Sequence, residues 1–370
     1  MRYLSSQLTY LILIFLPGLC FSQSFIQIAD SIRKTRGIPA IAYAVCSSDS
    51  IFDAGVCGFK KFATRDSIHM LSRFDIGTNT AAFTSYIAAQ MVQKGKIKWN
   101  TKLLDVFPEF KKKAFPVYQN ITLLELLSNQ TRLQPLLTID DWTRVPPMLG
   151  NTMSAKRRAF TLYMLQQKPY LENVVSKKIV YSVAGYVIAA SMLEKVAHKK
   201  WENLIVEYIN TPLKIVLTPG FPFITKPDST VTFGHWFQGN YYHYEDASTW
   251  LRIDPVLDPG FDANINLPDY IKFVQENLKG LTGKNASLSQ TAFEFIHYGV
   301  LDYSLGWYNG SFNNNSFSFH EGVSPLYDCR VEIIKEKNIG IIVMCNSGDK
   351  DGRGGVLDLI RLLEGYYFHR

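Results

Sequence analysis

Hydrophobic and polar positions follow two different periods along the chain, and these periods separate strands from helices. Phe25 to Arg36 has apolar residues at the three-to-four-residue spacing of an amphipathic helix. Ala40 to Val45 and Ile51 to Phe59 are short apolar runs on either side of the polar segment Ser47 to Ser50. The first part of the chain is therefore expected to form a helix and then two strands joined by a turn.

Helical periodicity dominates the middle of the chain. Asn79 to Lys94 is predicted to be a helix that stops at Gly95, and its central residues are apolar on nearly every face. A helix of that kind is buried on all sides. Tyr186 to Val196 and Leu267 to Leu278 are predicted to be two further helices.

Strand patterns return near the C-terminus. Three strands and a closing helix are predicted, at Ser316 to Phe319, Arg330 to Lys335, Ile339 to Cys345 and Val356 to Tyr367. Strands at both ends of a chain with helices between them indicate an antiparallel sheet that the two ends complete. We therefore predict an α+β fold with its sheet region at about 25–75 and 300–370, and an inserted helical region at about 76–299.

The first residues have the character of a secretory signal peptide. Arg2 precedes an apolar run from Leu11 to Cys20, and the small residue Ser22 follows. The run is too short to span a bilayer, and nothing like it recurs in the chain. We expect residues 1–22 to be a signal peptide that is cleaved after Ser22.

The mature chain, residues 23–370, is then expected to be an exported, soluble protein of the periplasm or the cell exterior. Cys20 raises the alternative of a lipid anchor, but Pro17, Gly18 and Leu19 before it match a lipoprotein signal poorly. We expect one domain, because no linker rich in Pro, Gly or Ser and no internal repeat divides the chain. The oligomeric state stays open.

Composition and charge exclude several classes of function. Of 370 residues, 47% are hydrophobic and 14% aromatic, which is typical of a globular protein rather than a disordered one. The net charge of +7 is spread out, with its densest patches at Lys111 to Lys113 and Lys199 to Lys200. These patches are interpreted as solvated faces beside helices and not as a nucleic-acid footprint. The seven histidines are scattered without metal-ligand spacing, so we expect neither a metal nor a cofactor.

Two of the four cysteines that remain after export flank the predicted C-terminal hairpin. This hairpin turns at Glu336 to Asn338, and a three-residue loop would place Cys329 opposite Cys345, within reach of a disulfide. The alternative is a pair of buried thiols. We favour the thiols, because the register of a hairpin is weakly specified by its sequence.

Several motifs follow one another in a fixed order. They are Ile76-Gly77-Thr78-Asn79-Thr80-Ala81-Ala82-Phe83-Thr84, Ile121-Thr122 through Gln130-Thr131, Tyr181-Ser182-Val183-Ala184-Gly185-Tyr186, Phe319-His320-Glu321-Gly322, and Gly340 to Asn346. In this order they resemble I-G-S-x-T-K-x-F-T, I-T-I-x-x-L-L-x-H-T-S-G, Y-S-N-x-G-Y, the H-x-G variant of K-T-G, and a strand that ends in Asn. The chain thus resembles the serine β-lactamase and penicillin-binding-protein-like family, which includes class C β-lactamases, DD-peptidases and esterases. The resemblance runs from about Ile28 to the C-terminus.

The resemblance implies which residues would carry the chemistry. In the family a Ser at a helix start attacks a carbonyl, and a Lys one turn later shares its proton with a Tyr. Thr78 stands at the Ser position, Ala81 at the Lys position and Tyr181 at the Tyr position. His320 begins the H-x-G motif. Without the Lys, the Tyr181 phenol is expected to stay protonated near neutral pH.

The resemblance also implies an oxyanion hole. Its two donors would be the main-chain N–H groups of Thr78 and of Val323, the residue after Gly322. We expect these N–H groups to face a common, vacant point, because core packing fixes both segments. Val183 replaces the Asn that would bind a substrate amide, and Asn129 replaces a His.

Arg132 and Leu326 stand where the family has Gly, so the departures affect several separate motifs. Simpler interpretations stay open: Tyr181 as a packed aromatic residue, and His320 as a strand-end residue turned to solvent. An aromatic patch is either a carbohydrate or peptide platform or a loop packed on itself; it consists of Trp236, Phe237, Tyr241, Tyr242, Tyr244 and Trp250.

Two functions compete. In the first, the chain is a pseudoenzyme whose cleft binds a peptide, a cell-wall fragment, a small acyl compound or a protein partner without turnover. In the second, it is a weak acyl hydrolase in which Thr78 attacks. We favour the first, because a nucleophile needs a base within hydrogen-bond reach and the sequence offers none. A purely structural role is a third possibility.

Overall fold

A computed structural model of the protein describes residues 24–170, 179–225, 228–238, 241–245, 254–312 and 315–368. The expected signal peptide and its cleavage point after Ser22 lie outside these residues. No helix in the described ranges is long and apolar enough to cross a membrane.

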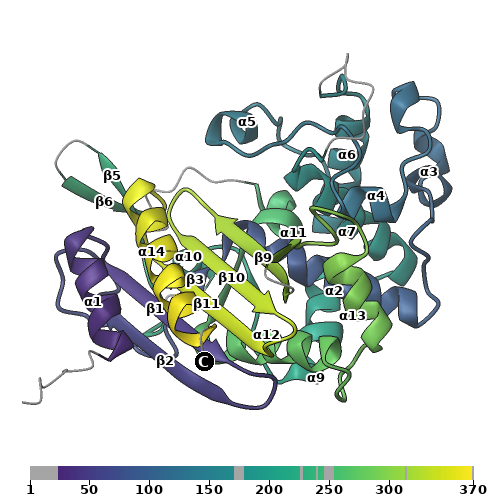
Figure 1. Ribbon diagram of the computed structural model, residues 1–370. Helices are drawn as coiled ribbons and strands as arrows, with labels where there is room; N and C mark the ends of the chain where they lie inside the picture. Colours follow the sequence, from purple (N-terminus) through teal and green to yellow (C-terminus); the bar gives the residue numbers. More distant parts are fainter. Residues whose placement is uncertain are drawn as a thin grey trace, which may run out of the picture.

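A six-stranded antiparallel sheet is built from both ends of the chain (Figure 1). Its order is β2-β1-β11-β10-β9-β8. The strands are β1 (Ala40–Cys46), β2 (Ile51–Gly58), β8 (Tyr308–Phe312), β9 (Asn315–Val323), β10 (Asp328–Ile334) and β11 (Ile339–Cys345). Because β1 pairs with β11, the N-terminal hairpin and the C-terminal strands form one sheet, as the hydrophobic pattern predicts.

Helices cover both faces of this sheet. On one face, Ile41, Tyr43 and Val45 of β1 join a core with α1 (Phe25–Thr35) and α14 (Lys350–Tyr367). The alternate β1 residues Ala40, Ala42 and Ala44 belong to the larger core on the other face. This alternation follows from the two-residue period of a strand, and it explains why β1 is buried along its whole length.

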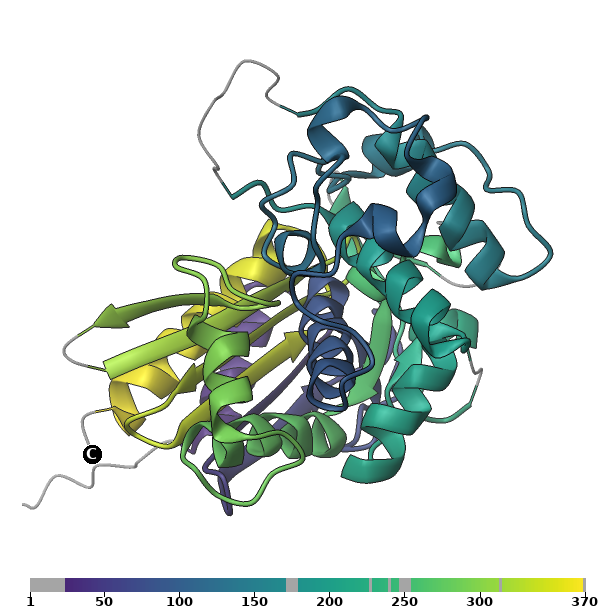
Figure 2. The same cartoon turned by 90° about the vertical axis from the view of Figure 1, so that its right-hand side faces the viewer.

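The region between the two halves of the sheet is largely helical. The buried α2 (Thr80–Gln93) packs against α7 (Val183–Ala197), and α12 (Leu267–Leu281) contacts β1 and β11. In Figure 2, most of the blue and teal helices of this region lie together to one side of the main sheet. The others are α3 (Leu103–Val106), α4 (Leu123–Leu127), α5 (Ile139–Thr143), α6 (Met153–Leu165), α8 (Trp201–Ile205), α9 (Thr211–Leu213), α10 (Pro222–Thr225), α11 (Asp258–Phe261) and α13 (Gln290–Tyr298), with short helices η1 (Gly77–Asn79), η2 (Pro108–Phe110), η3 (Pro116–Tyr118), η4 (Val206–Asn210) and η5 (Pro255–Leu257).

Short strands inside this region were not expected from the sequence. β3 (Arg73–Asp75), β7 (Ala263–Asn266) and β4 (Thr218–Pro219) form a small sheet, and β5 (Gly234–Gln238) pairs with β6 (Tyr241–Glu245). Segments this short carry too few positions for an alternating pattern.

The β5–β6 hairpin carries part of the aromatic patch, whose residue Trp250 lies outside the described residues. The Trp236 ring stacks on His243 with centroids 5.2 Å apart. The Lys61 ammonium lies 3.4 Å from the centre of the Tyr244 ring. Of the patch residues, Trp236 thus packs on another side chain of the hairpin, and Tyr244 packs on a lysine from outside the hairpin.

The register of the C-terminal hairpin differs by one residue from the predicted register, which was wrong. Ile334 pairs with Ile339, so the loop has four residues instead of three. Cys329 therefore lies opposite Met344, and Cys345 lies opposite Asp328. A one-residue slip turns a side chain to the other face of a sheet. Cys329 belongs to one core and Cys345 to the other, and both are free thiols.

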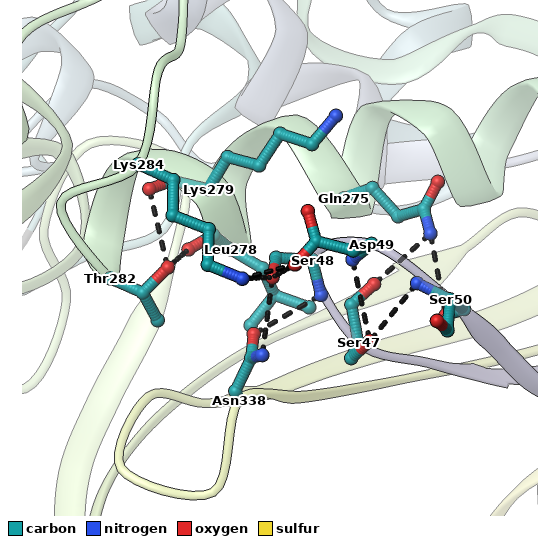
Figure 3. Close-up of polar contacts among 10 residues, drawn as sticks. All are labelled: Ser47, Ser48, Asp49, Ser50, Gln275, Leu278, Lys279, Thr282, Lys284 and Asn338. Carbon is teal, nitrogen blue, oxygen red and sulfur yellow. Dashed lines mark hydrogen bonds and ion pairs between the residues drawn. The ribbon is translucent and has the colours of Figure 1, made fainter.

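A polar cluster ties the β1–β2 turn to the β10–β11 turn and to α12 (Figure 3). The Ser48 N–H donates to Asn338 Oδ1 over 3.1 Å, and Asn338 Nδ2 donates back to Ser48 Oγ over 3.1 Å. Lys284 donates to Ser48 Oγ over 2.8 Å and pairs with Asp49. Gln275 of α12 donates to the Ser47 carbonyl over 3.0 Å. These bonds thus hold the turns of the N-terminal and C-terminal hairpins against each other and against α12.

Candidate functional site

Thr78 lies on a tight turn between β3 and α2. β3 ends at Asp75, and both of its carboxylate oxygens accept from the Gly77 N–H at 3.1 Å. Gly77 has a φ of +50°, in the left-handed region that favours glycine. The short helix η1 follows at once and places Thr78 at the entrance of α2, with 8% of its surface exposed.

The end of β9 lies directly on this turn. A Cβ atom added at Gly322 would lie 2.0 Å from the Ile76 carbonyl oxygen, and one added at Gly77 would lie 2.7 Å from the Val323 carbonyl oxygen. Side chains at these two positions would force the segments apart. Glycine at both positions therefore brings the main chain of β9 within hydrogen-bond reach of Thr78.

The Thr78 hydroxyl is bonded to the main chain of β9 on both sides. It donates to the Glu321 carbonyl over 2.8 Å and accepts from the Val323 N–H over 3.3 Å. The Val323 N–H expected to point into a vacant oxyanion hole is thus occupied by the side chain of Thr78. The hydroxyl proton is thus donated to a main-chain carbonyl.

Tyr181 and His320 lie together behind Thr78. The Tyr181 hydroxyl is 3.4 Å from the Thr78 carbonyl oxygen and 3.4 Å from His320 Nε2. His320 Nδ1 donates to the Gly306 carbonyl, so Nδ1 carries the ring proton and Nε2 is the acceptor. His320 is buried and not turned to solvent.

Burial keeps both side chains neutral. It lowers the pKa of His320 to about 4, although the bond to the Gly306 carbonyl opposes this shift. It also raises the pKa of the Tyr181 phenol well above 10, and the neighbouring Tyr186 adds to the shift. A neutral Tyr181 therefore donates its proton to others and takes none from Thr78.

The remaining positions implied by the motifs have different surroundings. Ala81 is fully buried in the core around α2. Val183 is the first residue of α7 and lines the cavity beside Thr78. Asn129 has a φ of +57° and accepts from the Ser182 N–H over 3.0 Å, so it holds the segment before α7 in place.

A cavity of about 220 Å³ opens beside Thr78. It brings together five positions that lie in or beside the sequence motifs with four that carried no recognisable motif. The nine lining residues are Thr78, Tyr181, Val183, Val323, Leu137, Trp142, Phe261, Tyr308 and Glu321. Leu137, Trp142, Phe261 and Tyr308 come from three separate segments, and no local pattern marks them as neighbours of Thr78.

Three buried carboxyl groups, which no sequence motif marks, are joined to segments that line the cavity. Asp75 hydrogen-bonds to the side chains of Asp262 and Ser324. Burial raises the pKa of Asp75 to about 8, and it raises the pKa values of Asp258 and Asp262 well above their ordinary range. Asp75 bonds to the residues at positions 77, 324 and 262. The chain neighbours of these three residues, at positions 78, 323 and 261, all line the cavity.

Comparison with known proteins shows the family to which the chain belongs. The family model described as Beta-lactamase matches residues 25–364. The chain belongs to the β-lactamase family. Protein flp of Staphylococcus aureus (strain MW2) is 20% identical over 332 residues, which are 84% of this chain and 60% of the relative. The chain therefore spans less than two thirds of the length of that relative.

Solved structures of β-lactamase-like proteins share the fold. The octameric penicillin-binding protein homologue from Pyrococcus abyssi superposes with a TM-score of 0.72 at 18% identity, over 92% of this chain and 77% of that one. The penicillin binding protein from Bacillus halodurans gives 0.71 at 18% identity, over 90% and 99%. The predicted β-lactamase/transpeptidase-like α+β fold, with a sheet formed by both chain ends, is confirmed.

Proposed function

We propose that this β-lactamase family member is an exported pseudoenzyme. It binds a peptide, a cell-wall fragment or a small acyl compound in the retained cleft and does not turn it over. One observation carries the proposal: the Thr78 hydroxyl is bonded to two main-chain groups of β9 and to no titratable side chain among the described residues.

Nucleophilic attack needs a base at about 2.6–3.2 Å from the hydroxyl. The methyl group of Ala81 at the family's Lys position offers no lone pair. The phenol of Tyr181 stays protonated because its pKa is raised. The pKa of His320 is lowered to about 4, so its ring is a weak base, and its Nε2 faces the Tyr181 hydroxyl at 3.4 Å. The cavity, by contrast, is retained, and this favours binding over catalysis.

Intact-mass spectrometry tests the proposal. The purified mature protein, incubated with a chromogenic cephalosporin or a labelled penicillin, is expected to show no burst and no covalent adduct. The Thr78→Ala variant serves as the matched control for labelling elsewhere. An adduct that maps to Thr78 in the wild type and disappears in this variant contradicts the proposal and supports a weak hydrolase.

Restoring the family residues tests the placement of the site. Thr78→Ser combined with Ala81→Lys is expected to hydrolyse an activated ester detectably, and neither single change is, because nucleophile and base act as a unit. Since Ala81 is fully buried, circular dichroism must first show that the double variant is folded. If a folded double variant of unchanged stability remains inert, either the cleft is closed by Val183, Arg132 and Leu326 or the active site lies elsewhere.

A further inference from the structure

The walls of the cavity beside Thr78 are apolar and aromatic. The Trp142 and Phe261 rings pack with centroids 4.4 Å apart, and Tyr181 and Tyr308 contribute two more rings. Leu137 is 45% exposed and Val323 is 39% exposed. An apolar surface therefore continues from solvent into the cavity.

Two polar side chains in these walls, those of Trp142 and Thr78, are already paired within the protein. Trp142 Nε1 donates to the Leu136 carbonyl over 2.7 Å, so the indole has no free donor. Thr78 and the Val323 N–H bond to each other over 3.3 Å. A ligand gains little from hydrogen bonds to Trp142, to the Thr78 hydroxyl or to the Val323 N–H unless it displaces one of these contacts.

Glu321 is the charged residue among the described lining residues, and its carboxylate is neutralised. It pairs with Arg330 of β10, and with Arg353 of α14 at 2.6 Å. The Glu321 carbonyl, in contrast, accepts from Thr78. The two arginines in turn are engaged by carboxylates: Arg330 also pairs with Glu332. The described walls thus present neither a free anion nor a free cation to a ligand.

Size and charge together define a ligand class. A dry cavity of roughly 150 Å³ is enough to hold a benzene ring, and this one has about 220 Å³. Aromatic walls favour a ring at edge-to-face or offset contact. An ionised carboxylate would lose its hydration without gaining a counter-charge.

We infer that the cleft selects an uncharged ligand with a single aromatic ring and rejects the corresponding carboxylate. This inference rests on the proposed binding function and names its ligand class. It distinguishes the cleft from one suited to carboxylate-bearing compounds.

A matched pair of probes tests the preference. Phenylacetamide and phenylacetate have the same ring and nearly the same shape, and only the second is charged at pH 7. Titration calorimetry or ligand-observed NMR on the purified mature protein is expected to give a Kd for the amide that is lower by about tenfold or more. Equal affinities, tighter binding of the acid, or no binding of either probe overturns the inference.

A charge introduced at the mouth of the cavity tests whether the two probes bind inside it. Leu137→Lys is expected to reverse the preference, because the partly exposed side chain keeps its ammonium in water while reaching the ligand. Leu362→Lys adds the same charge on exposed α14, outside the cavity lining, and is expected to keep the wild-type preference.

If Leu137→Lys does not fold, Val323→Lys places the cation at the other exposed lining position. A folded Lys variant at either position that retains the wild-type preference overturns the inference, since the probes then bind elsewhere. Neither probe is an acylating agent. A covalent adduct at Thr78 in the mass experiment would therefore refute the proposed function without changing the outcome of this one.

Discussion

Replacing Asp75 by Asn is expected to flatten the pH dependence of stability near neutral pH. The carboxyl group of Asp75 links three walls of the cavity: it accepts from the Gly77 N–H before Thr78, and it bonds to Ser324 and Asp262. Asn is nearly isosteric and keeps a carbonyl oxygen for the Gly77 N–H. It carries no titratable proton.

The size of this effect on the free energy of unfolding follows from the raised pKa of Asp75. Burial raises the pKa of Asp75 from near 4 in an unfolded chain to about 8 in the fold. Between these values the folded protein holds a proton that the unfolded chain has released. The stabilisation from this proton is fully present below about pH 4 and is lost as the pH rises towards 8, at about 1.4 kcal/mol per pH unit.

Urea unfolding followed by tryptophan fluorescence at pH 5, 6, 7 and 8 measures this slope. The free energy of unfolding of the Asn variant is expected to fall less steeply with rising pH than that of the wild type. The two slopes are expected to differ by about 1.4 kcal/mol per pH unit. Asp258 and Asp262 titrate in the same cluster, so the difference between the proteins is the informative quantity. Asp105→Asn, on the exposed side of α3, is the control and should follow the wild type. Parallel curves for wild type and Asp75→Asn would refute the reasoning.

Three further predictions concern the scaffold. Gly322→Ala is expected to lower the free energy of unfolding by roughly 3 kcal/mol or more, measured in urea, because its Cβ would lie 2.0 Å from a main-chain oxygen. Arg157→Met removes a fully buried cation from two glutamates and is expected to cost about 3–5 kcal/mol, whereas Arg158→Met, in a surface pair, costs about 1 kcal/mol or less in the same assay. Cys329 and Cys345 are expected to react with a thiol reagent in denaturant without prior reduction; protection of both until a reductant is added would contradict the hairpin register.

Long periodic elements could be predicted from the sequence because their regularly spaced hydrophobic residues are the ones that pack in the core. The strand Ile339–Cys345 has the predicted bounds, and the N-terminal helix ends at Thr35, one residue before the prediction. The register of the last hairpin could not be predicted in the same way. The difference between a loop of three residues and one of four depends on the positive φ of Asn338 and on its bonds to Ser48, more than 280 residues away.

The candidate site was only partly predictable for a similar reason. Ordered motifs pointed to Thr78, Tyr181 and His320, and the structure places these three together. The bonds of the Thr78 hydroxyl depend on how closely β9 approaches the turn. The buried carboxyl of Asp262 has no sequence signal, since its environment is made by segments distant from it in the chain.

The pairing of β1 with β11 has a consequence for how the chain reaches this fold. Ile41 lies opposite Cys345, about 300 residues later. Contacts between residues so far apart are slow to form, because a long loop must close before they give any stabilisation. The N-terminal hairpin emerges first from the ribosome. Its strand β1, however, can pair with β11 only after the last strands of the chain have been made. Until then the apolar residues of β1 are exposed, and the nascent protein is expected to depend on chaperones or on delayed folding.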